Sequence, residues 1–147
     1  MNQITTQYVT EGGACYEQYV ITDPAAKTAL TITPERGGMI TGFTLDGDEY
    51  IWTRRPNFSE CNRPRFGVPV LFPSCGNPDG GVHLFDGKAY PMECHGFADL
   101  CAWEVESVGP DGVTLILEST PLTKFLYPFD FTLLVNYDLN GTTASIS

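Results

Sequence analysis

The sequence is poor in basic residues. Eight lysines and arginines stand against eighteen aspartates and glutamates, which gives a formal net charge of −10 over 147 residues. The only local concentration of positive charge comes from Arg54, Arg55, Arg63 and Arg65. A protein that binds nucleic acid needs a longer basic patch or stripe. Nucleic acid is therefore not an expected partner, and a neutral small molecule is the simplest ligand to expect.

Long apolar runs are also missing. No segment approaches the ~20 unbroken apolar residues of a membrane helix, and the start, MNQITTQYVTEGG, lacks the features of a signal peptide. The cysteines are odd in number and show no CxxC spacing; they are Cys15, Cys61, Cys75, Cys94 and Cys101. Such cysteines fit free thiols in a reducing compartment. We expect a cytoplasmic protein with no membrane partner, no metal and no cofactor.

Helical periodicity is absent too, so we expect no helix longer than about two turns. Short stretches rich in β-branched and aromatic residues predict strands instead: QYVITD, KTALTIT, MITGFTL, EYIW, AWEVESV, VTLILEST and FDFTLLVNYDL. Turn signals separate several of them: Asp46-Gly47, Asp86-Gly87, Gly109 to Val113 and Asn140-Gly141. The predicted fold class is all-β, an antiparallel sandwich or barrel, with residues 1–147 in a single domain.

The last residues, TLLVNYDLNGTTASIS, stop on what reads as a strand returning from a hairpin turn. A strand in that place would be an edge with little to cover it. We therefore expect a truncated sandwich or a half that needs a partner, and a homo-oligomer formed through this C-terminal edge strand is one option.

The strand pattern fails between residues 57 and 81, where the chain contains Pro64, Pro69, Pro73 and Pro78. Its apolar content argues against disorder, so we expect an ordered loop over the sheet. Proline removes a backbone donor and fixes φ, which makes VPVLFP a rigid extended segment. Two interpretations stay open: the wall of a ligand pocket, with Arg65 at its start as a hydrogen-bonding fork, or a packed crossing between two sheets.

A second unusual string is MECHGFADLCAW. His95 is a candidate ligand donor or proton carrier, whereas His83 is expected to be exposed in a hairpin. Cys94 and His95, as neighbours on a strand, should point to opposite faces, which disfavours a shared metal. Phe97 and Trp103 could form flat walls of a sugar pocket, although core packing is the commoner role of such aromatic residues.

The strings PERGGMITGF, DGDEYIW, RPRFGVPVLFPSCGNPDGG, YPMECHGFADLCAWEV and YPFDFTLLVNYDL occur in this order. Together they resemble the aldose 1-epimerase (mutarotase) family, near its glucose-6-phosphate 1-epimerase branch. The resemblance implies a large antiparallel β-sandwich of the galactose mutarotase-like type. It also implies an isomerase that interconverts the α and β anomers of an aldohexose by acid–base ring opening. Arg65 and His95 would bind sugar oxygens, with Phe97 and Trp103 as walls.

Two features depart from the family pattern. The family's general-acid histidine and general-base glutamate lie downstream of YPFDFTLLVNYDL, so residues 1–147 are expected to be an N-terminal half with binding residues and no assigned catalytic residue. Glu93 should face away from His95 on a strand. Asp99 stands where phosphate-handling relatives carry arginine, and an acid there would repel a phosphate. A neutral aldose is favoured, although Arg63 and Arg65 leave a phosphorylated sugar open.

Two other functions remain as alternatives at this point. One is a non-catalytic carbohydrate-binding or regulatory module of the same fold. The other is a structural domain that dimerises through its terminal edge and binds no sugar.

Overall fold

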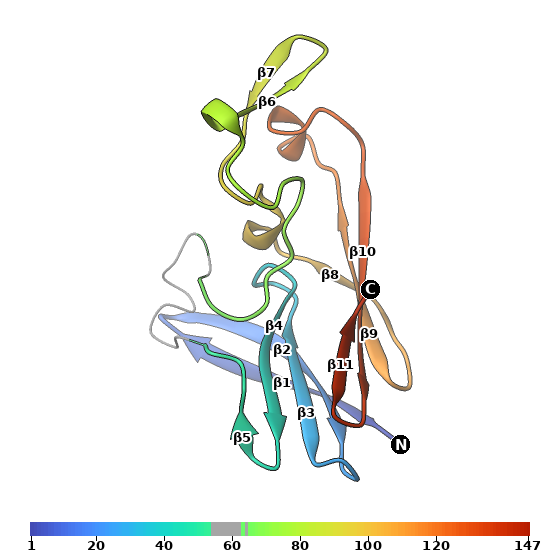
Figure 1. The fold of residues 1–147 in the computed structure, drawn as a ribbon. Helices are drawn as coiled ribbons and strands as arrows, with labels where there is room; N and C mark the ends of the chain where they lie inside the picture. The colour runs from blue at the N-terminus through green and yellow to red at the C-terminus, as the bar shows by residue number, and fades with distance from the viewer. Residues whose placement is uncertain (54–62, 64) are drawn as a thin grey trace.

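The computed structural model describes residues 1–53, 63 and 65–147, and its regular structure is almost entirely β (Figure 1). The strands are β1 (Gln3–Glu11), β2 (Ala14–Asp23), β3 (Thr28–Thr33), β4 (Met39–Leu45), β5 (Asp48–Glu49), β6 (Val82–Phe85), β7 (Lys88–Pro91), β8 (Glu104–Val108), β9 (Gly112–Glu118), β10 (Thr132–Asn140) and β11 (Thr143–Ile146). Among the described residues the helices are three single 3₁₀ turns: η2 (Asp79–Gly81), η3 (Ala98–Leu100) and η4 (Thr123–Phe125). None of these turns has the length or apolar character to cross a membrane.

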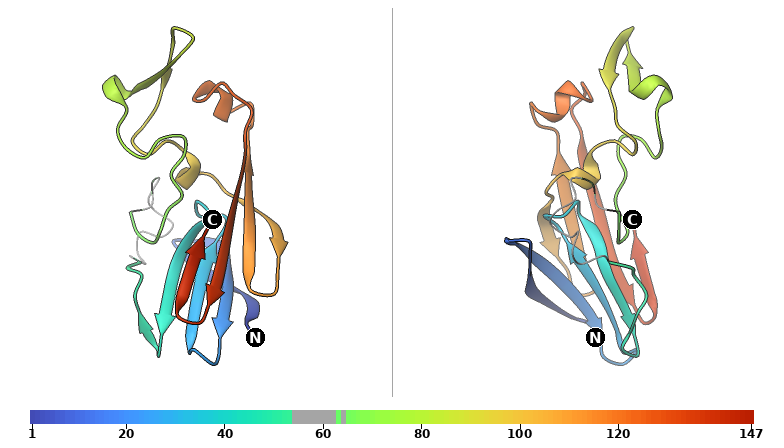
Figure 2. Two further views of the ribbon diagram at one scale, coloured as in Figure 1. Left: turned by 45° about the vertical axis from the view of Figure 1, so that its right-hand side comes forward. Right: turned by 90° about the vertical axis from the view of Figure 1, so that its left-hand side faces the viewer.

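The strands form two antiparallel sheets and a separate hairpin. One sheet has the order β1-β2-β3-β4-β5, the other has the order β11-β10-β9-β8, and β6 pairs with β7 alone. The two larger sheets lie one against the other, as the turned views in Figure 2 show. One core cluster joins them, because it contains Leu30 and Ile32 of β3 together with Leu115 and Leu117 of β9. The predicted all-β sandwich is confirmed.

Alternation of side chains explains why these segments form strands with one buried face. In β9, Val113, Leu115 and Leu117 are buried at every second position. The facing residue Tyr137 of β10, which pairs with Val113, is also fully buried. Each such apolar side chain contributes about 1.5–3 kcal/mol when it leaves water, so this face of β9 holds the four-stranded sheet against the other.

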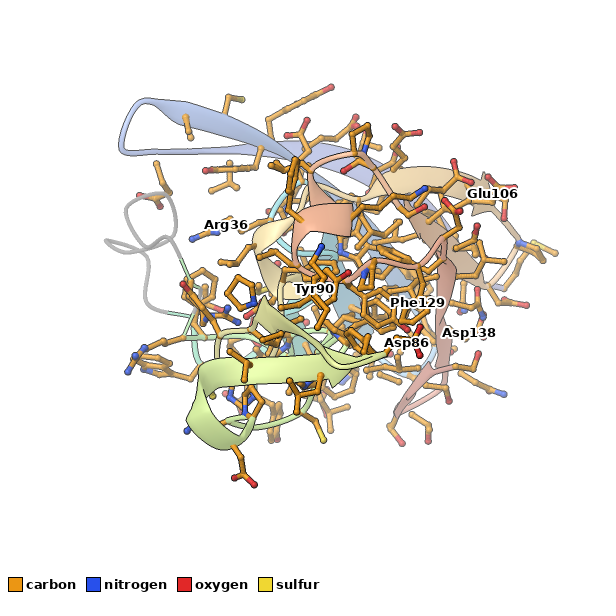
Figure 3. All side chains as sticks on the ribbon, turned by 90° about the horizontal axis from the view of Figure 1, so that it is seen from above. Arg36, Asp86, Tyr90, Glu106, Phe129 and Asp138 are labelled. Carbon is orange, nitrogen blue, oxygen red and sulfur yellow. The ribbon has the colours of Figure 1, made fainter. Side chains whose placement is uncertain are left out.

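The predicted turns at Asp46-Gly47 and Asp86-Gly87 are confirmed. All four residues have positive φ, the backbone conformation of the two-residue hairpin turn that Asp-Gly favours. The second turn closes the hairpin β6–β7, which carries His83 and lies at one end of the molecule (Figure 1). The ring of Phe85 lies 5.7 Å from that of Tyr90 and 5.1 Å from that of Phe129, two residues labelled in Figure 3.

The C-terminal strand β11 lies at the edge of its sheet, and all four of its residues are exposed. The expected edge is therefore present, while self-association through it stays a prediction. The first strand, β1, was not among the predicted strands. Its sequence, QITTQYVTE, is mostly polar and its side chains are mostly exposed, so it lacks the apolar alternation that marks the other strands.

Residues 65–81 form an ordered loop, as expected; residues 57–62 and 64 of the same predicted segment lie outside the described residues. The amide of Gly67 donates to the carbonyl of Trp52 at 3.0 Å, and that of Val68 donates to the carbonyl of Ile40 at 2.9 Å. Val70 and Phe72 pack against the main core cluster. The loop is therefore fixed along the edge of the first sheet.

Candidate functional site

Arg65 and His95 line the same cleft, which has a volume of about 640 Å³. Three segments that are distant in sequence form it: the residues after β5, the start of the proline-rich loop, and the turn before η3. The lining residues are Tyr50, Ile51, Trp52, Arg63, Arg65, Phe66, Gly67, Pro69, Leu71, Cys94, His95 and Asp99. A cleft of this size accommodates a small organic ligand.

The position of Arg65 follows from the packing of the two residues after it. Phe66 is buried. Gly67 has a φ of +69°, and a Cβ there would lie 2.5 Å from the carbonyl oxygen of Ile40, so only glycine fits at this point. Arg65 itself is exposed, and no described carboxylate forms an ion pair with it. Its guanidinium is available to a ligand in the cleft.

His95 sits in a turn and not on a strand. Its φ is +70°, and its amide donates to the carbonyl of Gly76 at 3.0 Å. The expectation that Cys94 and His95 point to opposite faces of a strand is therefore wrong, because both residues line the cleft. His95 Nδ1 is buried and has no hydrogen-bond partner among the described residues. A buried polar atom without a partner is unusual, and a ligand hydroxyl could supply the missing bond.

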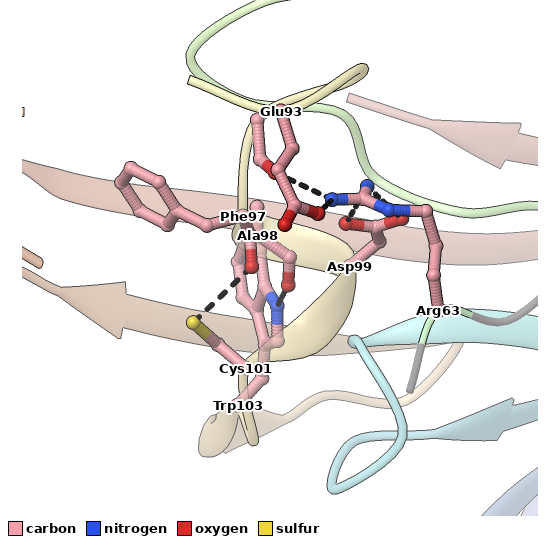
Figure 4. Close-up of polar contacts among 8 residues, drawn as sticks. Arg63, Glu93, Phe97, Ala98, Asp99, Cys101 and Trp103 are labelled. Atoms are coloured by element: carbon pink, nitrogen blue, oxygen red, sulfur yellow. Dashed lines mark hydrogen bonds and ion pairs between the residues drawn. The ribbon is translucent and has the colours of Figure 1, made fainter. Parts of the chain in front are cut away.

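Asp99 and Arg63, which both line the cleft, form a part-buried ion pair (Figure 4). Asp99 is 1% exposed, and both of its carboxylate oxygens accept from Nη1 of Arg63 at 2.7 Å. Nη2 of Arg63 donates to the carbonyl of Gly96 at 2.7 Å. Burial raises the pKa of Asp99 above its ordinary value, and the adjacent Arg63 opposes that rise. The positive charge of Arg63 is therefore already matched inside the protein.

Glu93 lies outside the cleft lining. Its side chain is largely exposed, and Oε2 approaches Nη2 of Arg63 at 3.4 Å. Asp99 is thus the only carboxylate among the described residues that line the cleft, and it is occupied by Arg63. The described lining of the cleft therefore offers no unpaired carboxylate that could act as a general base.

Phe97 and Trp103 are not brought to this cleft. They are 4% and 3% exposed, respectively. The indole Nε1 of Trp103 donates to the carbonyl of Ala98 at 3.0 Å, and the ring of Phe97 packs edge-on against that of Phe72 with centroids 5.9 Å apart. Both are large apolar groups next to the sandwich core, so burial takes them away from the ligand side.

Two other aromatic residues line the cleft instead. Tyr50 and Trp52 are 61% and 65% exposed, unusually high for such large side chains. The pattern EYIW predicts a strand that includes both residues, but β5 contains only Asp48 and Glu49. The signal that could have identified them is their spacing of two residues, which places two aromatic rings on one side of an extended segment.

Comparisons with known proteins identify the family. The family model of aldose 1-epimerase matches residues 17–147. The chain belongs to the aldose 1-epimerase family. Among solved structures, it resembles the Slr1438 protein from Synechocystis sp. PCC 6803, with a TM-score of 0.82 and 29% identity over 99% of this chain and 50% of that chain. It also resembles a galactose mutarotase related enzyme from Lactobacillus acidophilus, with a TM-score of 0.72 and 27% identity over 84% of this chain and 39% of that one.

A relative in sequence is the plasmid-encoded protein LacX of Lactococcus lactis. It is 28% identical over 111 residues, which are 71% of this chain and 36% of LacX. The chain thus spans half or less of the length of these relatives. The galactose mutarotase-like fold expected from the sequence is confirmed over nearly the whole of this chain.

Proposed function

We propose that this chain binds an uncharged aldohexose in the cleft of Arg65 and His95, as the binding part of an aldose 1-epimerase. The observation that carries the proposal is the meeting of these two residues in one cleft of about 640 Å³. They come from motifs thirty positions apart. Among the described residues, the guanidinium of Arg65 has no ion-pair partner and Nδ1 of His95 has no hydrogen-bond partner. Both groups are suited to adjacent sugar hydroxyls.

The aromatic residues of the cleft also support a sugar as the ligand. Tyr50 and Trp52 are exposed beside the two polar groups. A sugar ring has apolar C–H faces and polar edges, so a site with aromatic surfaces and a few convergent donors suits it. In this proposal the edge hydroxyls of the sugar meet Arg65 and His95, and its ring lies against an aromatic face.

An uncharged sugar is favoured by the charges in the cleft. Of the two described arginines there, Arg63 is paired with Asp99, and only Arg65 forms no ion pair with a described carboxylate. A phosphate group is best held by several donors, often paired arginine contacts. One exposed arginine in a protein with a net charge of −10 is a weak anion site.

The family reaction opens the sugar ring, with a base that removes the proton of the anomeric hydroxyl and an acid that protonates the ring oxygen. We assign neither role to a described residue, because the only carboxylate that lines the cleft is held by Arg63. A second candidate function, a carbohydrate-binding module of the same fold without catalysis, needs no such residue. The two functions differ in whether this chain accelerates anomer exchange.

The test is NMR exchange spectroscopy and line broadening on glucose, galactose and glucose 6-phosphate with this chain. We expect binding of an uncharged hexose, weakened strongly in Arg65→Met and His95→Ala. The matched controls are Lys88→Met and His83→Ala, which alter a lysine and the other histidine on the separate hairpin.

The possible results separate the alternatives. Faster exchange of anomers supports the isomerase, and binding without faster exchange supports the binding module. Absence of binding to any of the three sugars would overturn both, and equal loss in the control variants would show that Arg65 and His95 are not the site.

A further inference from the structure

Arg63 binds three parts of the segment that carries His95. Its Nη1 contacts both carboxylate oxygens of Asp99 at 2.7 Å, and its Nη2 contacts the carbonyl oxygen of Gly96 at 2.7 Å and Oε2 of Glu93 at 3.4 Å. Glu93 lies two residues before His95, Gly96 lies one residue after it, and Asp99 lies four residues after it. Figure 4 shows the guanidinium in the middle of this group.

The backbone at His95 needs such support. His95 and Gly96 both have positive φ, of 70° and 76°. A non-glycine residue in this conformation is strained and persists only where its surroundings hold it. Backbone hydrogen bonds fix the two ends, since the amide of His95 donates to Gly76 and that of Phe97 donates to Phe72. The carbonyl of Gly96, between them, is held by the side chain of Arg63.

Lysine could not do the same. A guanidinium is a planar fork of fixed geometry, whereas an ammonium is a point charge on a flexible stem. Here one nitrogen of the fork, Nη1, meets the carboxylate of Asp99 while a second nitrogen, Nη2, reaches Gly96. The buried carboxylate therefore fixes the orientation in which Arg63 reaches the His95 turn.

We propose that Arg63, oriented by Asp99, is the positioning residue that holds His95 toward the ligand in the cleft. This rests on the proposed function. Arg63 acts through His95, and both of its terminal nitrogens donate to protein groups. Asp99 consequently also determines specificity, because it keeps the second guanidinium of the cleft away from an anionic ligand.

The experiment compares Arg63→Lys, Arg63→Gln and Asp99→Asn with the wild type and with Lys124→Gln. Lys124 is the matched control, because its Nζ forms an ion pair at 2.5 Å with the exposed Asp130 and it does not line the cleft. The first readout is the imidazole NMR spectrum. The chain has two histidines, so the signals of His83 provide an internal reference for those of His95. The second readout is the dissociation constant for glucose and for glucose 6-phosphate.

We expect the signals of His95 to move in Arg63→Lys and Arg63→Gln while those of His83 stay in place. Glucose affinity should fall about tenfold or more, since small displacements of a binding group are costly. Asp99→Asn should shift the preference toward glucose 6-phosphate. If Arg63→Gln does not fold, Arg63→Lys and Asp99→Asn, which preserve more of the side-chain volume, decide the question.

Failure of this inference can be told apart from failure of the proposed function. If the wild type binds glucose and folded Arg63 variants bind it equally well, Arg63 does not position His95. If the wild type binds no sugar, the proposed function is overturned, and the imidazole spectra still test the positioning role. Unchanged His95 signals in both Arg63 variants would overturn the positioning role of Arg63.

Discussion

Gly96 and Phe72 approach so closely that a Cβ atom on Gly96 would lie 2.1 Å from the carbonyl oxygen of Phe72. The two residues form an isolated parallel bridge, and the same carbonyl accepts from the amides of Phe97 at 2.8 Å and Ala98 at 3.2 Å. The proline-rich loop and the His95 turn are joined at this contact. Because each segment contributes residues to the cleft, the contact ties together two of its walls.

Gly96→Ala should therefore destabilise the protein and weaken sugar binding together. The methyl group must displace backbone atoms, in addition to the cost of about 1–2 kcal/mol for a positive φ. Gly87→Ala is the control, since Gly87 also has a positive φ of 77° but has open space where a Cβ would lie. Urea denaturation should show a clearly larger loss of unfolding free energy for Gly96→Ala. Equal losses at the two positions would contradict the role given to the contact with Phe72.

The ion pair of Arg63 and Asp99 predicts a stability effect that depends on pH. Arg63→Met leaves a buried carboxylate without its partner, which should cost about 3–5 kcal/mol at neutral pH. The pKa of Asp99 is already raised by burial, and loss of the arginine should raise it further. A carboxyl group whose pKa is higher in the folded state than in the unfolded state lowers the stability of the fold only at pH values where it is ionised in the unfolded chain. For aspartate that is above about pH 3.9.

The difference in stability between wild type and Arg63→Met should consequently shrink as the pH falls through the raised pKa of Asp99 toward 4. Denaturation series at several pH values would measure it. Lys124→Met, which removes one partner of an exposed pair, should show little loss at any pH. A loss in Arg63→Met that stays constant down to pH 4 would mean that ionised Asp99 is not its cause.

Most of the fold could be predicted from the sequence because the signals are local. Alternating apolar residues identify β9 and β10, and Asp-Gly pairs identify their own turns. The strand β1 has neither signal, since it is polar and is held by pairing with β2 along its whole length. Such a strand is stabilised by its neighbour's hydrogen bonds, which a single sequence does not reveal.

The site was predictable only in part, for a related reason. Arg65 and His95 lie in motifs that indicate their roles, whereas the pairing of Arg63 with Asp99 spans 36 positions and has no local signature. Phe97 and Trp103 follow His95 closely in sequence, but their burial depends on long-range packing around η3, whose Ala98 belongs to the main core cluster together with Trp103. Composition alone does not distinguish an aromatic residue of the core from one that faces a ligand.

The described cysteines should differ in how fast iodoacetamide alkylates their thiols. Burial and the charge of Asp99 raise the pKa of Cys101, so its thiolate fraction at pH 8 is reduced, and the thiolate is the reactive form. Cys15 and Cys75 are exposed. We expect iodoacetamide to modify these two well before Cys101, as measured by peptide mass spectrometry over time. Modification of Cys101 at the same rate as Cys15 in the folded protein would contradict the burial described here.

The two tryptophans should respond differently to a sugar. Trp52 lines the cleft and is exposed, whereas Trp103 is buried. In Trp52→Phe the remaining emission should be poorly quenched by acrylamide and unchanged by glucose, while the wild type should show both responses.

Trp52→Ala should weaken glucose binding about fivefold, the effect of roughly 1 kcal/mol from an aromatic contact. The control is Phe125→Ala, which removes an exposed ring outside the cleft. Equal affinities in the two alanine variants would exclude Trp52 from the sugar site and leave Arg65 and His95 to bind it without an aromatic surface.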